Sequence, residues 1–262
     1  MSIDVHSTVD GPPEAPVVVL SGSLGSTLEM WEPQVAALAA RFRVVRYDIR
    51  GHGGSPVPDG PYEMADLGGD VLRLLDRLGA DRVRFAGLSI GGMTGLWLAA
   101  HAPERVERLA VLCTSALLGP ADAWAQRAAT VRTEGTGAVA DAVVGRWFTP
   151  GFAEREPGVV DQMRAMVAST PAEGYAGCCA AIERMDLRSD LAAITAPTLV
   201  IAGAEDPATP PEHAERITAG VGGARLRVVP DAAHLASWEQ ADEVNGLLLD
   251  HFAAATPHPH TS

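Results

Sequence analysis

Cysteine is scarce in this chain, and its few cysteines suggest neither a metal site nor a disulfide framework. The 262 residues include Cys113, Cys178 and Cys179. Their spacing matches no metal-ligand motif, and adjacent cysteines rarely form a bridge with each other. Reduced thiols are typical of the cytoplasm. We therefore predict a cytoplasmic protein without a metal ion.

Positive charge is also in short supply. Lysine and arginine together number 20 against 33 acidic residues, which gives a net charge of −13, and the basic residues form no cluster. Nucleic-acid binding depends on neutralising phosphates with basic side chains, so this composition argues against a nucleic-acid partner. An anionic small molecule would need cations placed locally, and arginines supply most of the candidates.

Long apolar runs are missing as well. No stretch approaches the length of a membrane span, so we expect no membrane partner. The first six residues lack both the basic region and the apolar core of a secretory signal. The sequence does not indicate the oligomeric state.

What the chain does contain is enough apolar sequence, 47% of its residues, for one substantial core plus an inserted segment. Strand-like runs alternate with helix-like runs, and the strands are predicted at residues 3–9, 17–21, 44–48, 83–86, 109–113, 198–202 and 225–229. Helices are predicted at residues 35–41, 70–78 and 93–100. Residues 119–186 carry helical stretches and proline breakers but no clear strand. This layout predicts an α/β fold with a mostly parallel sheet flanked by helices.

The same layout divides the chain into parts. We predict one discontinuous core domain made of residues 1–118 and 187–254. The helical segment of residues 119–186 would form a lid over it. Residues 255–262 are polar and punctuated by proline, so we expect a disordered tail.

The stretch Gly87-Leu88-Ser89-Ile90-Gly91-Gly92 has the spacing of a nucleophile elbow. Glycine is abundant here, with 27 residues, so such a string can also arise by chance. Its position is more specific, because it lies between a predicted strand and a predicted helix. A sharp strand-to-helix turn strains the central residue, and neighbours without a Cβ relieve the crowding. The pattern predicts Ser89 as a nucleophile.

A base and an acid are expected later in the chain, in the order serine, acid, histidine. Asp206 and His234 each follow a predicted strand, where an open α/β sheet gathers its functional loops. Glu205 and Asp231 are nearby rivals of Asp206, although Asp231 is better suited to the turn before His234. His52 is the main rival of His234, but its place in an Arg-Gly-His-Gly-Gly-Ser turn favours a turn-shaping role.

The oxyanion hole of such a site needs two backbone amides. One should come from Ile90, which follows the nucleophile. The other should come from the loop after the strand at residues 17–21, where Ser23 is the first choice and Leu24 the second. A plain strand-to-helix turn would also explain the glycines of this loop.

Together these features resemble the α/β-hydrolase superfamily. Longer strings narrow the resemblance to the 3-oxoadipate enol-lactonase family, over about residues 11–252: Ser23-Leu24-Gly25 with Met30-Trp31, Arg46-Tyr47-Asp48, Arg50-Gly51-His52-Gly53, Gly87 to Met93, His101 to Arg105, Arg146 to Pro150, and Tyr175 with Cys178 to Ile182. The resemblance implies an α/β-hydrolase fold with a helical lid inserted after the sixth strand. It leaves open whether the family's first antiparallel strand is present. Gly22 stands where many members carry a polar side chain, so a side-chain role there is in doubt.

The resemblance also implies an activity, the cofactor-free hydrolysis of 3-oxoadipate enol-lactone in the β-ketoadipate pathway. Ser89, His234 and Asp206 would act through an acyl-enzyme. The substrate carries a carboxylate, and Trp124 with Arg127 falls on one face of a predicted lid helix, so Arg127 could bind it. An exposed arginine on an ordinary amphipathic helix is the alternative. Trp147 is a further lid candidate, although it could simply pack the lid on the core.

Other functions fit the same residues. A generic carboxylesterase, a cofactor-free perhydrolase or a C–C bond hydrolase could use this set, and the lid pocket would distinguish them. A ligand receptor on the same fold is an alternative of another class. Haloalkane dehalogenases and epoxide hydrolases are disfavoured, because they need a carboxylate in place of Ser89.

Overall fold

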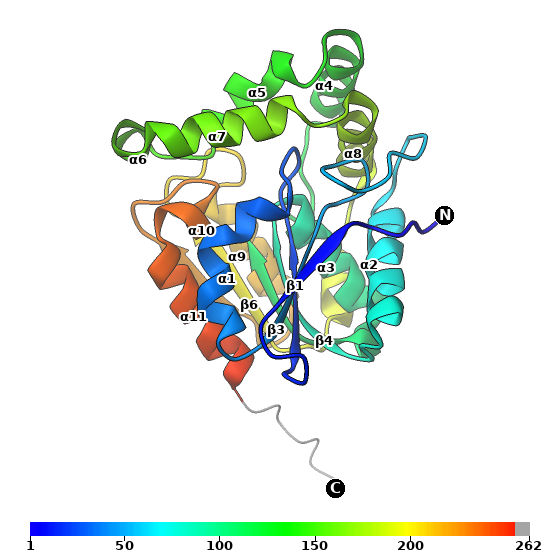
Figure 1. Cartoon of the computed structure of the whole chain (residues 1–262), viewed down its shortest axis with the longest axis vertical. Coiled ribbons are helices and arrows are strands. Elements are labelled where there is room, and N and C mark those ends of the chain that lie inside the picture. The colour runs from blue at the N-terminus through cyan, green and yellow to red at the C-terminus, as the bar shows by residue number, and fades with distance from the viewer. Residues whose placement is uncertain (255–262) are drawn as a thin grey trace, which may run out of the picture.

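The computed structural model describes residues 1–254 and shows a seven-stranded sheet with helices on both faces (Figure 1). The tail predicted to be disordered, residues 255–262, lies outside the described residues. The strand order is β1-β3-β2-β4-β5-β6-β7, and β1 pairs antiparallel with β3 while the other pairs are parallel. The strands are β1 (Ser7–Asp10), β2 (Val17–Ser21), β3 (Arg43–Tyr47), β4 (Val83–Leu88), β5 (Val106–Leu112), β6 (Thr198–Gly203) and β7 (Arg225–Val229).

Helices cover both faces of this sheet, which explains why its central strands are apolar on both sides. Figure 1 shows α1 and α11 on one side of the sheet and α2 and α3 on the other. The core helices are α1 (Glu32–Ala39), α2 (Met64–Leu78), α3 (Ile90–His101), α9 (Pro211–Gly220), α10 (Ala236–Glu239) and α11 (Ala241–Ala253), with short 3₁₀ helices η1 (Leu28–Trp31), η2 (Pro103–Arg105) and η3 (Leu191–Ala193). The predicted fold class is confirmed.

Element boundaries differ from the predictions where side chains cap the backbone. Helix α2 begins at Met64 rather than at residue 70, because Glu63 and Asp66 form a capping box at its start. The predicted strand at residues 3–9 is paired only over β1. Before it, the amide of Ile3 donates to Asp70 Oδ1 at 2.7 Å, so this segment is held against α2 instead of the sheet.

Five helices occupy the segment between β5 and β6, above the carboxyl ends of the strands in Figure 1. They are α4 (Ala121–Glu134), α5 (Gly137–Val144), α6 (Pro150–Arg155), α7 (Pro157–Ala168) and α8 (Ala172–Arg184). Its two ends meet where the Leu187 amide donates to the Ala116 carbonyl at 2.8 Å. The predicted position after the sixth strand is wrong for this chain. Five strands precede the segment, because residues 1–6 do not form the additional first strand of that count.

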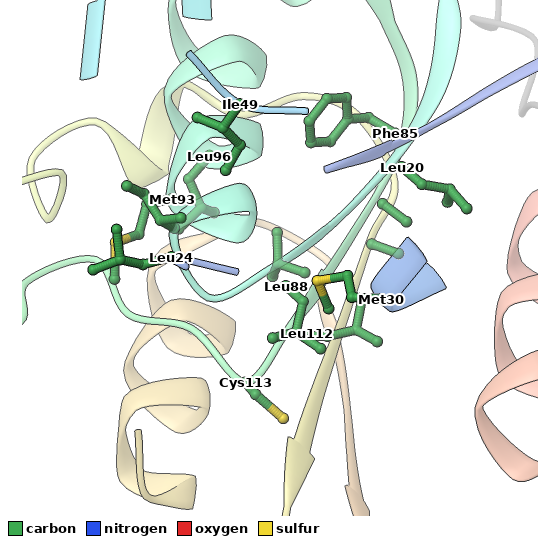
Figure 2. Close-up of a cluster of buried hydrophobic side chains, with 14 of the residues drawn as sticks. Leu20, Leu24, Met30, Ile49, Phe85, Leu88, Met93, Leu96, Leu112 and Cys113 are labelled. Carbon is green, nitrogen blue, oxygen red and sulfur yellow. The ribbon is translucent and has the colours of Figure 1, made fainter. Parts of the chain in front are cut away.

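The hydrophobic core reaches up to the strand ends that face the inserted helices. Figure 2 shows Leu88 and Leu112, the last residues of β4 and β5, close to Met30 and Cys113. Leu88, Met30 and Leu112 are fully buried, and Cys113 is 1% exposed. Apolar packing of this kind holds the strand ends rigidly, since protein interiors are close-packed. The loops that follow these strands therefore start from fixed positions.

Candidate active site

Ser89 lies in the turn between β4 and α3, in a backbone conformation that side chains rarely adopt. Its φ and ψ angles are 57° and −119°. The turn is possible because glycines flank it. A Cβ on Gly87 would lie 2.1 Å from the carbonyl oxygen of Gly91, and one on Gly91 would lie 2.2 Å from the carbonyl oxygen of Ser21. The strain predicted from the Gly-x-Ser-x-Gly pattern is therefore present at Ser89.

Asp206 and His234 form a buried hydrogen-bonded pair at the ends of β6 and β7. His234 Nδ1 donates to Asp206 Oδ2 at 2.8 Å. The same carboxylate accepts hydrogen bonds from the Thr209 hydroxyl at 2.7 Å and from the amides of Ala208 and Thr209 at 2.8 and 3.1 Å. Burial alone would raise the pKa of Asp206, but His234 and the bonds from Thr209 outweigh it and lower the pKa to about 2. The carboxylate is therefore ionised at neutral pH.

The neighbouring acids are placed differently. Glu205 is exposed, and its amide donates to the Ala232 carbonyl. Asp231 is also exposed and has a φ of 51°, and its carbonyl accepts from Gln240, so it shapes the turn before His234 as predicted. The ordering role of Thr209 was missed at the sequence level. The local signal for it is the Asp-x-x-Thr spacing after β6, which lets a side chain cap its own turn.

A cavity of about 300 Å³ separates the strand ends from the inserted helices. Ser89 and His234 line it from the sheet side, while Trp124, Arg127 and Trp147 line it from the insertion. The structure thus brings Ser89 and His234, which are 145 positions apart in the sequence (234 − 89), to the same cavity. Trp147 is also 3% exposed, and its carbonyl accepts from the amide of Leu235 at 2.8 Å, so it packs the insertion on the core as well.

The two loops predicted to supply amides also meet at this cavity. Ser23 and Leu24 line it, and Ile90 follows Ser89 at the start of α3. The amide of Ser23 already donates to Met30 Sδ at 3.0 Å. Within residues 1–254, the amides of Leu24 and Ile90 have no hydrogen-bond acceptor. These two amides are therefore free to donate a hydrogen bond to a bound molecule.

Two cationic side chains reach the cavity from the insertion. The Arg127 guanidinium lies over the Trp124 ring, 4.5 Å from its centroid. Arg146, in the turn after α5, lines the same cavity and was not predicted. Burial lowers the pKa of Arg146, and the positive charge of Arg127 lowers it further. In the described part of the chain, neither guanidinium forms an ion pair with a carboxylate.

Tyr175, on α8, completes the polar surface beside these arginines. It is fully buried, and its hydroxyl has no hydrogen-bond partner among residues 1–254. Burial raises the pKa of Tyr175 well above its usual value, and Arg127 and Arg146 oppose that rise. Arg146 and Tyr175 both belong to sequence strings that resemble the enol-lactonase family, but only the fold shows that they share a cavity with Ser89.

Over residues 1–254, no three histidine, cysteine or acidic side chains are grouped so that they could hold a metal ion. The three cysteines are buried and unpaired. No helix in this range is both long enough and apolar enough to cross a membrane.

Comparison with known proteins agrees with this fold. The sequence profile of the family described as "alpha/beta hydrolase fold" matches residues 15–241, and the chain belongs to this family. Within it, the chain is similar to 3-oxoadipate enol-lactonases 2 and 1 of Acinetobacter baylyi strain ADP1, with 42% and 38% identity. Each alignment covers 90% of this chain and 88% of the relative. The crystal structure of the enol-lactonase from Burkholderia xenovorans LB400 superposes with a TM-score of 0.93 at 45% identity, covering 95% of this chain and 96% of that one.

Proposed function

We propose that this chain hydrolyses 3-oxoadipate enol-lactone to 3-oxoadipate. One observation carries the proposal. The cavity lined by Ser89 and His234 is also lined, from the inserted helices, by Arg127 and Arg146, which have no acidic partner in residues 1–254. Residues suited to ester cleavage thus share a cavity with guanidinium groups that could bind an anion. This lactone has both an ester bond and a carboxylate. The enol-lactonase relatives support the assignment.

Acylation begins with proton transfer from Ser89. Because His234 Nδ1 donates to the ionised Asp206, the lone pair of the neutral ring is on Nε2. This nitrogen accepts the proton as Ser89 Oγ attacks the lactone carbonyl carbon. Asp206 then stabilises the imidazolium and keeps the ring in one orientation, which Thr209 reinforces by holding the carboxylate.

The carbonyl oxygen becomes negatively charged in this step and needs amide donors. Leu24 and Ile90 supply them in our proposal, because their amides have no acceptor in residues 1–254. Leu24 replaces Ser23 as the preferred second donor, since the Ser23 amide is bonded to Met30. Ser23 remains a lining residue of the cavity.

Ring opening breaks the bond between the acyl carbon and the enol oxygen. His234 returns its proton to that oxygen, and the enol then tautomerises to a ketone. This removes the nucleophile that could close the ring again. A water molecule, deprotonated by His234, attacks the acyl carbon and releases Ser89 together with the new carboxylic acid. No cofactor enters any of these steps.

The substrate carboxylate is the feature that distinguishes this lactone from a simple ester. We assign its binding to Arg127, which Trp124 holds by a cation–π contact, and to Arg146. Partial dehydration of the cavity strengthens the attraction between a carboxylate and a guanidinium. Trp147 would form an apolar wall beside the ring. The cytoplasmic location predicted from the cysteines stays a prediction.

Steady-state hydrolysis of the enol-lactone tests the proposal, with 4-nitrophenyl acetate as the comparison ester. We expect kcat/KM for the lactone to exceed that for the acetate by several orders of magnitude. Loss of the enol-ester absorbance follows the reaction, and 3-oxoadipate is identified as the product. Efficient hydrolysis of the acetate without lactone turnover would instead indicate the general carboxylesterase. Labelling by a fluorophosphonate without turnover of either substrate would indicate a receptor that retains a reactive serine.

A further inference from the structure

The loop of residues 22–26, between β2 and η1, is held by two buried side chains that take no part in the mechanism above. One is His52. Its Nε2 accepts a hydrogen bond from the Gly25 amide at 3.0 Å, and its Nδ1 donates to the Arg50 carbonyl at 3.1 Å. Both bonds together require a neutral ring with the proton on Nδ1. Burial lowers the pKa of His52 to about 4, so the ring is neutral at physiological pH.

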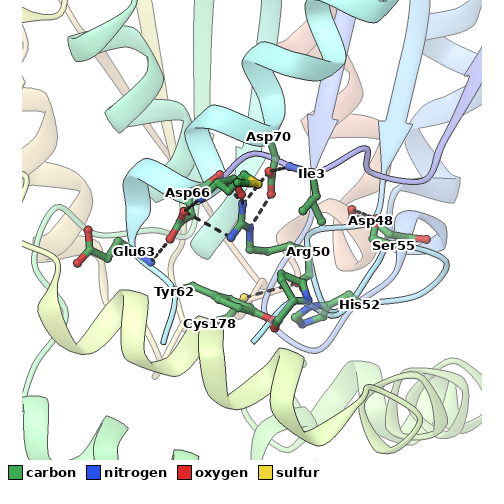
Figure 3. A network of polar contacts seen from close by, with 12 residues as sticks. Ile3, Asp48, Arg50, His52, Ser55, Tyr62, Glu63, Asp66, Asp70 and Cys178 are labelled. Carbon is green, nitrogen blue, oxygen red and sulfur yellow. Dashed lines mark hydrogen bonds and ion pairs between the residues drawn. The ribbon is translucent and has the colours of Figure 1, made fainter. Parts of the chain in front are cut away.

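The turn that carries His52 is itself fixed to the core. Arg50 forms a buried ion pair with Asp70 of α2, with its Nε 2.6 Å from Asp70 Oδ2. Figure 3 shows this pair above His52, with the side chain of Tyr62 alongside. Gly51 is packed directly against Gly174 of α8, since a Cβ on Gly51 would lie 2.3 Å from the Cα of Gly174. The imidazole thus has little freedom to move.

Met30 holds the other side of the loop. Its sulfur accepts a hydrogen bond from the Ser23 amide at 3.0 Å. The Ser26 hydroxyl lies 2.9 Å from the same sulfur and donates to the Ser23 carbonyl at 2.7 Å. The Met30 side chain is fully buried, and its carbonyl accepts from Trp238 at 2.6 Å. A Cβ on Gly22 would lie 2.7 Å from the Ser26 hydroxyl oxygen and 2.9 Å from the same sulfur, so the close packing of this loop favours glycine at that position.

As a result, three of the four consecutive backbone amides at residues 23–26 already donate hydrogen bonds within the protein. Ser23 donates to Met30, Gly25 donates to His52, and Ser26 donates back to the Ser23 carbonyl at 3.1 Å. Leu24 alone of the four has no acceptor in the described chain, and it lines the cavity beside Ser89. We propose that His52 and Met30 are positioning residues, which hold this loop from both sides so that the Leu24 amide is kept free for the oxyanion. The inference rests on the proposed acyl chemistry at Ser89, but not on which ester is the natural substrate.

The first test replaces His52. His52→Leu removes the acceptor for Gly25, whereas His52→Gln retains an acceptor close to the position of Nε2. Loss of one oxyanion donor costs about 100- to 1,000-fold in kcat, so displacement of the loop by His52→Leu should lower kcat about 10- to 100-fold. KM and the inhibition constant of 3-oxoadipate should stay within about twofold of the parent values, because neither the bound substrate nor the bound product has the negatively charged tetrahedral oxygen. His52→Gln should recover most of kcat.

The second test replaces Met30 by leucine, which conserves volume but cannot accept a hydrogen bond. We expect the same pattern, a fall in kcat of about tenfold with KM unchanged, and a matching fall in the rate of fluorophosphonate labelling. His101→Leu, an exposed histidine on α3, is the matched control and should behave like the parent protein.

Both tests use 4-nitrophenyl acetate as well as the enol-lactone, so the inference can be judged even if the lactone is not the substrate. If Met30→Leu and a folded His52→Leu both keep the parent kcat, the positioning role is wrong. Equal changes in kcat, KM and product inhibition would also contradict it, because they would indicate general loosening of the cavity. Should His52→Leu fail to fold, Met30→Leu and His52→Gln decide the question.

Discussion

The strand-end loops and the inserted helices line the same cavity, but their polar side chains differ in how many hydrogen-bond and ion-pair partners they have. At the strand ends, the Asp206 carboxylate accepts four hydrogen bonds, and one of them holds His234 in place. In the insertion, Arg127 and Arg146 have no carboxylate partner within residues 1–254. Satisfied groups keep a fixed geometry, whereas unpaired charges attract a ligand. On this basis we propose that the core performs the chemistry and that the insertion selects the substrate.

The largest effect should come from the core, with Ser89→Ala. Removing the nucleophile should lower kcat on the order of 10⁶-fold, as loss of a serine nucleophile does elsewhere. The variant should also fail to react with a fluorophosphonate. Ser189→Ala, at an exposed serine, is the control and should retain the parent rate. Turnover of the enol-lactone by Ser89→Ala within tenfold of the parent would remove Ser89 from the mechanism.

Asp206→Asn should have the next largest effect. The amide cannot stabilise the imidazolium and favours the wrong tautomer of His234, so kcat should fall about 10⁴-fold while KM changes little. The neighbouring Glu205→Gln is the control, because Glu205 is exposed and lies outside the hydrogen-bonded pair. Rates measured on the lactone and on 4-nitrophenyl acetate should fall together. A selective loss on the lactone alone would mean that Asp206 belongs to substrate recognition.

Arg127→Ala should produce a smaller effect of a different kind. A hydrogen bond to a charged group contributes about 1.5 to 3 kcal/mol, so KM for the anionic lactone should rise about 10- to 100-fold. The neutral lactone with a methyl group in place of the carboxymethyl group should be almost unaffected. Arg132→Ala is the control on the same helix, since Arg132 pairs with Glu173 instead. Equal effects on both lactones would exclude Arg127 as the carboxylate ligand.

The core should also be the part that is sensitive to mild acid. Burial lowers the pKa values of His52 and His251 to about 4. Between pH about 6.5 and about 4, the two histidines are therefore protonated in the unfolded chain but neutral in the folded chain. Their contribution to the free energy of unfolding is fully present above this pH range and is lost as the pH falls through it. Each histidine should account for up to about 3 kcal/mol of the unfolding free energy.

Urea unfolding at pH 7 and pH 4.5 measures this loss. His251→Gln should reduce it, whereas His101→Gln, at an exposed ring, should not. If the parent protein has the same unfolding free energy at both pH values, the two buried histidines do not behave as neutral groups in the fold.

Much of the core could be predicted from the sequence, because its signals are local. The apolar run at β2 and the Gly-x-Ser-x-Gly turn each lie within a few residues. Asp206 and His234 were placed by the rule that parallel strands present their carboxyl ends on one edge. Helix α2 was predicted too short, although the capping residues Glu63 and Asp66 were a readable signal.

The insertion and the oxyanion loop were less predictable, because their roles depend on distant contacts. The Ser23 amide appeared suitable until the fold placed Met30 Sδ against it. Arg146 lies in the turn after the short helix α5, and the packing of that turn decides whether its side chain faces solvent or the cavity. Helical spacing did indicate that Trp124 and Arg127 share a face, and their cation–π contact agrees with this.

The division of labour between core and insertion is tested most directly by one ratio. It is kcat/KM for the carboxymethyl lactone divided by kcat/KM for the methyl lactone, measured for the parent protein and for the Arg127→Ala, Arg146→Ala double variant. We predict a large ratio for the parent that falls to near one in the double variant, while the rate on the methyl lactone is retained. A ratio that survives both substitutions, or an equal collapse of both rates, would contradict the account.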